Sequence, residues 1–120
     1  MTIREAITLA DAQKPNQVSK ELKIRWLSEL DGRVMCEIIS PKGEERFAGY
    51  AATTSEETVL KVPYPYDAVY PAWIAMHVSR VNGETARCND YADVCEEHLD
   101  GFRRFWARTV KPTPRKLKYF

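Results

Sequence analysis

A stripe of apolar and small residues near the C-terminus constrains the fold of this 120-residue chain most strongly. Its positions are separated by alternating steps of four and three residues, the spacing that places side chains along one side of an α-helix. The stripe consists of Cys88, Ala92, Cys95, Leu99, Phe102, Trp106 and Thr109. A stripe of this length has to pack against other helices, so the pattern predicts a long helix within a helical domain.

Two further helices are predicted before residue 40 from capping residues and apolar periodicity. Thr2 and Glu5 have the spacing of a capping box, and Pro15 ends the helix that they begin. Ser19 is the expected cap of the second helix. Gly32 lies inside the second pattern, where it marks either a close contact between helices or a weaker second half. The apolar positions of both helices are Ile3, Ala6, Ile7, Ala10, Ile24, Trp26, Leu27, Leu30, Val34 and Ile38.

A third helix is predicted after the segment Tyr64-Pro-Tyr-Asp67, with Asp67 as its cap. Asn82-Gly83 supplies residues able to adopt the left-handed conformation that closes a helix. Because the turn to the long C-terminal helix is short, we expect the two helices to form an antiparallel hairpin. Tyr70 and Trp73 are expected in the core. The apolar face of the third helix comprises Val69, Tyr70, Trp73, Ile74, His77, Val78 and Val81.

Residues 40 to 62 interrupt the helical periodicity. Pro41 and Gly43 punctuate this segment, and Phe47, Tyr50 and residues 59–62 are compatible with short β-structure. The segment is therefore expected to be an irregular loop or a small β-hairpin between the second and third helices. The sequence as a whole predicts a mainly α, four-helix bundle-like domain over residues 1–110, followed by an extended basic tail over residues 111–120.

Charge and cysteine content exclude some classes of protein. The formal net charge of +1 argues against a protein that binds nucleic acid with its whole surface, since such proteins are far more basic. The sequence has no run of 18 apolar residues, so no transmembrane helix is expected. The N-terminal segment lacks the apolar core and cleavage site of a secretory signal. Three cysteines, an odd number, fit free thiols in a reducing cytoplasm better than a disulfide framework.

The cysteines and histidines are candidates for metal binding or catalysis. Cys88, Cys95 and His98 lie roughly on one face of the long helix, and His77 could approach from the third helix, an inventory suited to tetrahedral zinc. The spacing of the two thiols is not that of a zinc motif, however, and both fall on the apolar stripe, where cysteine behaves as a small apolar residue. The sequence also contains no Ser-His-Asp arrangement and no glycine-rich phosphate loop. We expect no metal, no cofactor and no enzymatic activity.

Charge is strongly segregated in the last third of the chain. Residues 84–100 carry six acidic side chains and one basic, whereas residues 103–120 carry seven basic side chains and no acid. The helix dipole accounts for this order as far as Lys111 but not for the basic residues beyond two prolines. The tail is interpreted as a docking strand for an acidic protein groove or for phosphates, with simple disorder as the alternative.

Aromatic residues crowd the start of the third helix, and tyrosine is favoured at interfaces. Together with the basic residues they form the predicted partner-binding set. The set comprises Tyr64, Tyr66, Arg104, Arg108, Lys111, Arg115, Lys116, Lys118, Tyr119 and Phe120.

Several segments of this sequence, in this order, resemble the small head–tail connector (adaptor) proteins of tailed bacteriophages and prophages. They are Lys23-Ile-Arg-Trp-Leu-Ser-Glu-Leu-Asp-Gly32, Val62-Pro-Tyr-Pro-Tyr-Asp67, Asn82-Gly-Glu84, Asn89-Asp-Tyr91 and the aromatic-basic terminus. The resemblance implies an all-helical structural protein that docks beneath the portal ring as an oligomeric ring and links the DNA-filled head to the tail.

The same resemblance implies where such a protein works and what it contacts. Its partners would be the portal protein, other connector or tail proteins and further copies of itself, with non-specific DNA contact in the channel. It would act in the virion after assembly in the host bacterial cytoplasm, and it could be a monomer when alone. Residues 41–62 and 111–120 would carry contacts. The alternative hypothesis is a small helical DNA-binding or regulatory module that uses the basic C-terminal surface.

Overall fold

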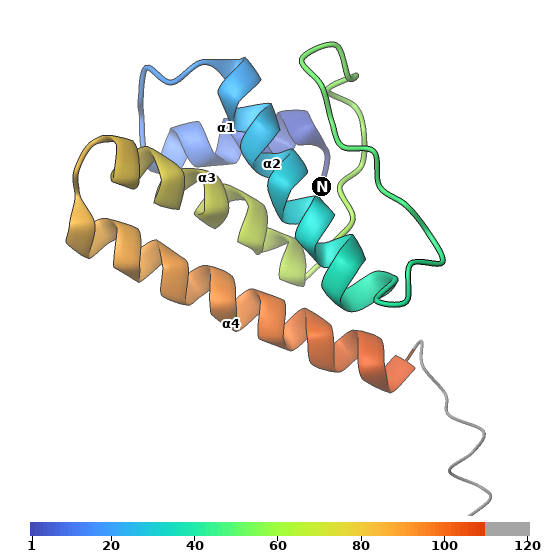
Figure 1. Cartoon of the computed structure of the whole chain (residues 1–120). Helices are drawn as coiled ribbons and strands as arrows, with labels where there is room; N and C mark the ends of the chain where they lie inside the picture. Colours follow the sequence, from blue (N-terminus) through green and yellow to red (C-terminus); the bar gives the residue numbers. More distant parts are fainter. Residues whose placement is uncertain (110–120) are drawn as a thin grey trace, which may run out of the picture.

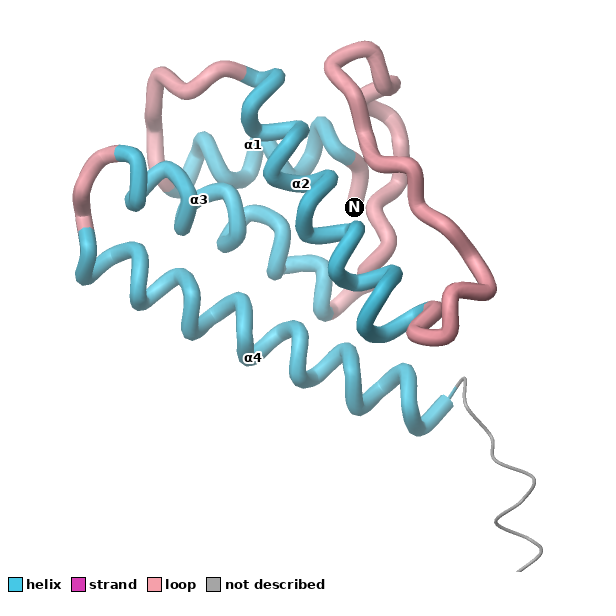
Figure 2. The backbone as a smooth tube through the Cα atoms, viewed as in Figure 1, coloured by secondary structure: helices cyan, strands magenta, loops and turns pink. Residues whose placement is uncertain are grey.

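The structure, a computed structural model, describes residues 1–109 and contains four α-helices in that range (Figure 1). Their bounds are α1 Ile3–Gln13, α2 Lys20–Val34, α3 Val69–Val81 and α4 Thr85–Thr109. Figure 2 shows these helices joined by loops, without a strand in the described range. The prediction of a mainly helical, bundle-like domain is confirmed. No helix within residues 1–109 is long and apolar enough to cross a membrane.

The capping residues read from the sequence begin the first two helices. At α1, Thr2 Oγ1 accepts a hydrogen bond from the Glu5 amide at 3.2 Å, and Glu5 Oε1 accepts one from the Thr2 amide at 2.8 Å. The predicted capping box is thus confirmed. At α2, Ser19 Oγ accepts from the Leu22 amide at 3.3 Å, as predicted. A π-helical turn, Met35–Ile39, extends α2 and keeps Ile38 buried.

Helix α3 is the centre of the domain. It contacts α1, α2 and α4, and nearly all of its side chains are buried, including Tyr70. Gly83 has a φ of 75°, the left-handed conformation that was expected to close the helix, and α4 then runs back along α3 (Figure 1). The predicted antiparallel hairpin of these two helices is confirmed.

The apolar stripe of α4 is buried only in its middle. Cys95, Leu99 and Phe102 are buried, whereas Thr109 is exposed. Val81 at the end of α3, predicted on an apolar face, is 63% exposed. Length explains Thr109, because α4 has 25 residues against 13 in α3 and extends beyond its partner at this end. Val81 is the last residue of α3, beside the turn at Gly83.

The loop between α2 and α3 is irregular, and the alternative prediction of a β-hairpin is wrong. Its backbone pairs with the start of α1 instead, through bonds from the Ile3 amide to the Thr58 carbonyl at 3.1 Å and from the Arg4 amide to the Glu56 carbonyl at 3.0 Å. The first amides of a helix have no partner inside it, so the loop carbonyls supply acceptors that a hairpin would have used internally.

Asp67 is not the cap of α3, contrary to the prediction. A 3-10 turn, Tyr66–Ala68, leads directly into α3, whose first residues receive no side-chain cap. The Asp67 carboxylate lies 3.5 Å from the amino group of Met1. The carboxylate is therefore directed to this contact, and the 3-10 turn replaces the cap in starting the helix.

A buried carboxylate holds the loop against the helices. Asp31 on α2 is fully buried and accepts hydrogen bonds from the hydroxyls of Tyr50 and Tyr70, each at 2.5 Å, and from the Lys61 amide at 3.1 Å. The Tyr70 hydroxyl also accepts from the Val62 amide at 2.7 Å. The cluster thus joins α2, α3 and both ends of the loop segment 50–62.

Candidate docking surface

An aromatic cluster joins the 3-10 turn to the C-terminal half of α4. The Tyr66 ring centroid lies 6.2 Å from that of Phe102 and 5.7 Å from that of Phe105, and Trp106 lies 5.9 Å from Phe102. Gly101 permits this contact, since a Cβ atom there would lie 2.9 Å from the Tyr66 ring. Tyr66, predicted at an interface, is thus already packed within the fold.

The predicted interface residues that the structure describes gather at this end of the molecule. Tyr64, two positions before Tyr66, is 85% exposed, and Arg104 and Arg108 are exposed on α4. Neither arginine forms an ion pair within residues 1–109, whereas Arg103 bonds to Asp100 at 2.7 Å. The remaining predicted residues, Lys111, Arg115, Lys116, Lys118, Tyr119 and Phe120, lie outside the described residues.

We call this region the aromatic–basic end. It comprises Tyr64, Tyr66, Arg104, Phe105, Trp106 and Arg108. Phe105 and Trp106 are half-buried, so that part of each ring stays exposed. Aromatic side chains and arginines are both enriched at protein interfaces, and their presence on one half of α4 makes this the candidate docking surface of the described chain.

The three cysteines lie apart and differ in exposure. Cys95 is buried, its sulfur lies 3.9 Å from the Val69 carbonyl oxygen, and burial raises the pKa of the thiol to about 12. A thiol held protonated in this way behaves as a small apolar group. Cys88 is half-buried and Cys36 is exposed. Across residues 1–109 no three potential ligands come together around a common metal position.

Sequence reasoning missed a stack of rings around His77. The imidazole lies parallel to the Trp26 ring with centroids 4.8 Å apart and meets the edge of Trp73 at the same distance. Trp73 Nε1 donates a hydrogen bond to the backbone carbonyl of Trp26 at 2.8 Å, which orients the Trp73 indole against α2. The His77 Nε2 atom is buried with no hydrogen-bond partner among the described residues. Burial, with a smaller contribution from Arg80, lowers the pKa of His77 to about 4.

This lowered pKa predicts a stability change with pH. Between the ordinary histidine pKa of about 6.5 and the folded value of about 4, the unfolded chain binds more protons at this position, so the free energy of unfolding falls as pH decreases through that window. Urea unfolding at several pH values should show this slope, and His77→Phe should flatten it. An equal slope in the wild type and the variant would contradict the assignment.

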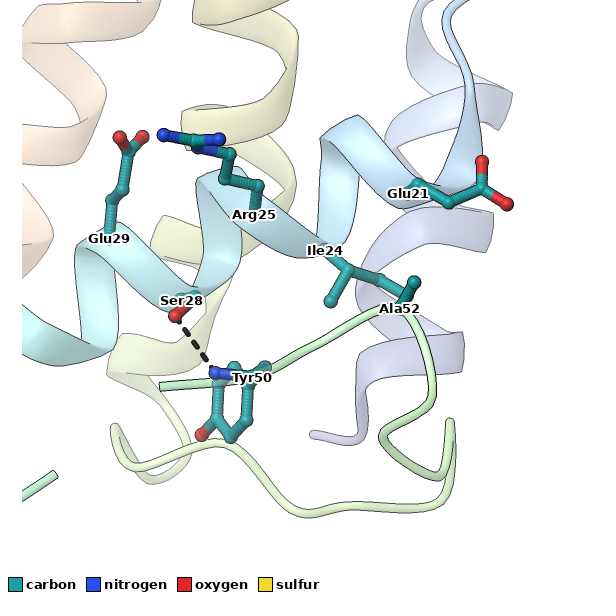
Figure 3. A pocket seen from close by; sticks show the side chains of 7 residues that line it. All are labelled: Glu21, Ile24, Arg25, Ser28, Glu29, Tyr50 and Ala52. Carbon is teal, nitrogen blue, oxygen red and sulfur yellow. Dashed lines mark hydrogen bonds between the residues drawn. The ribbon is translucent and has the colours of Figure 1, made fainter. Parts of the chain in front are cut away.

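A shallow hollow lies where the loop crosses α2. It encloses about 450 Å³ and is lined by Glu21, Ile24, Arg25, Ser28, Glu29, Tyr50 and Ala52. Figure 3 shows the charged groups of Arg25 and Glu29 on one side of α2, with the Ser28 hydroxyl bonded to the Tyr50 amide at 2.9 Å. The Ser28 hydroxyl is therefore used to hold the loop. The hollow brings together no nucleophile and base suited to catalysis.

Comparison of the chain with known protein families, with curated proteins and with solved structures finds no match in any of the three.

Proposed function

We propose that this protein is a structural head–tail connector of a tailed bacteriophage or prophage, which docks on the portal as an oligomer. The observation that carries the proposal is the aromatic–basic end, where exposed arginines with no ion pair among residues 1–109 share the C-terminal half of α4 with partly exposed rings. The sequence segments that resemble connector proteins support the portal protein as the partner.

The aromatic–basic end suits docking because its two components act differently. Aromatic side chains bury a large area at small entropic cost and supply affinity, and arginines form bidentate bonds with carboxylates and set the orientation of the partner. The rest of the domain is tied together by the Asp31 cluster and the central helix α3. The proposed docking surface thus rests on a well-packed support.

Charge reversal at this end tests the proposal. The double variant Arg104→Glu/Arg108→Glu is expected to weaken binding to the portal protein encoded beside this chain by at least about tenfold, because attraction becomes repulsion. Titration of labelled protein with purified portal rings measures the change. The matched control is Arg80→Glu/Arg87→Glu, which alters the charge equally at the opposite end of the α3–α4 hairpin and should bind as the wild type does.

DNA-binding measurements on the same proteins distinguish the connector proposal from the DNA-binding alternative. A DNA-binding module would bind a short duplex with an affinity that falls steeply as salt rises, since each phosphate contact releases a counterion. We expect weak duplex binding and tight portal binding. Tight, salt-sensitive binding to the DNA duplex without binding to the portal would contradict the connector proposal and support a DNA-binding module.

A further inference from the structure

The side of α4 that faces away from the domain carries an ordered row of charges. We call it the outer stripe, and it consists of Asp90, Asp93, Glu97, Arg104 and Arg108. All are exposed, and at 3.6 residues per turn they lie opposite the buried Cys95, Leu99 and Phe102. The described elements that contact α4 are α3 and the turns before α3 and after α2, none of which covers the outer stripe (Figure 1).

Charges of the outer stripe have no partners within the described chain. None of the five forms an ion pair there, although neighbouring charges such as Asp100 and Arg103 do. The acids occupy the first half of the stripe and the bases the second half. Acids and bases in this order are too far apart along one helix to pair with each other, because only residues three or four positions apart meet.

The order becomes self-complementary when two copies of α4 run antiparallel. Glu97 and Arg104 lie equally far on either side of the point between Asp100 and Gly101, and so do Asp93 and Arg108. A two-fold axis through that point would therefore set Glu97 of each copy opposite Arg104 of the other, and Asp93 opposite Arg108. Every pair occurs twice, as in any isologous interface.

We propose that the outer stripe binds a second copy of this chain, with the two α4 helices antiparallel. The attraction is electrostatic between exposed groups, so the dimer forms at low salt and dissociates as salt rises. The pairing does not depend on a portal. Its consequence for assembly rests on the proposed function, because a dimer of this kind covers Arg104 and Arg108 until a portal competes for them.

A charge swap tests the pairing by sedimentation equilibrium of the full chain at low and high salt. Glu97→Arg is expected to raise the dissociation constant at least about tenfold, since it places two repulsive pairs in the dimer. Arg104→Glu should do the same. The combination Glu97→Arg/Arg104→Glu restores opposite charges and is expected to return the dissociation constant to near its original value.

Controls separate pairing from folding and from portal binding. Glu96→Arg changes the same charge on an exposed position beside the outer stripe and should leave the dimer intact, and circular dichroism checks that each variant folds. A wild-type monomer at low salt, or a swap that fails to restore dimerisation, overturns the pairing. Portal binding is measured separately, so a dimer that ignores the portal refutes only the connector proposal.

Discussion

Replacing Asp31 by alanine is expected to lower the free energy of unfolding by about 3 kcal/mol, because it leaves buried hydrogen-bond donors without an acceptor. The carboxylate accepts from the hydroxyls of Tyr50 and Tyr70 and from the Lys61 amide. Burial raises the pKa of Asp31 although these bonds oppose the shift, which shows how far the group is removed from water. Without it the loop segment 50–62 loses its two hydrogen bonds to this carboxylate of α2 and keeps the one from the Tyr50 amide to Ser28.

Urea unfolding followed by circular dichroism measures this loss as a shift of the midpoint. Glu29→Ala is the matched control, since it removes an exposed carboxylate from the same helix and should change stability by less than about 0.5 kcal/mol. Tyr70→Phe should fall between the two, because it leaves the Val62 amide unpaired but keeps the ring. Equal effects of Asp31→Ala and Glu29→Ala would contradict the structural role of the buried carboxylate.

Adding a methyl group at Gly101 is expected to destabilise the domain by about 1–2 kcal/mol, although alanine normally favours a helix over glycine by about 1 kcal/mol. The new Cβ would lie 2.9 Å from the Tyr66 ring, which is held by Phe102 and Phe105. The ring would have to leave its place, and the link between the 3-10 turn and α4 would weaken. Chemical unfolding of Gly101→Ala measures the effect.

A double-mutant cycle identifies the cause. In a Tyr66→Ala background the same Gly101→Ala substitution should stabilise the domain by about 1 kcal/mol, because the ring is gone and the helix preference remains. Gly32→Ala in α2 is a second control and should also stabilise, since its Cβ would meet only Phe47, at 3.9 Å. A destabilising Gly101→Ala in both backgrounds would show that the Tyr66 contact is not responsible.

The features that the sequence predicted correctly are those governed by neighbours along the chain. The Thr2 and Ser19 caps, the left-handed Gly83 and the periodic burial of Leu99 and Phe102 all depend on residues within one or two helical turns. Of the two roles left open for Gly32, the close contact between helices is not found within residues 1–109, because a Cβ atom there would meet only Phe47 of the loop, at 3.9 Å.

The structural features that the sequence did not predict depend on contacts between residues far apart in the chain. Asp31 is a charged residue in an amphipathic helix, and nothing nearby reveals that it meets Tyr70, 39 positions away. Nothing in the sequence indicates that the amides of α1 bind the loop, which leaves a hairpin as an alternative. At the candidate site, the approach of Tyr66 to Gly101 required knowledge of how the hairpin of α3 and α4 packs.

The most direct test of the connector proposal is the mass of the complex that forms when the folded protein is mixed with purified portal rings encoded at the same locus. We expect a discrete complex with about one copy of this chain per portal subunit, as a ring that follows the symmetry of its partner requires. A folded protein that migrates apart from the portal at all concentrations tested would contradict the proposal.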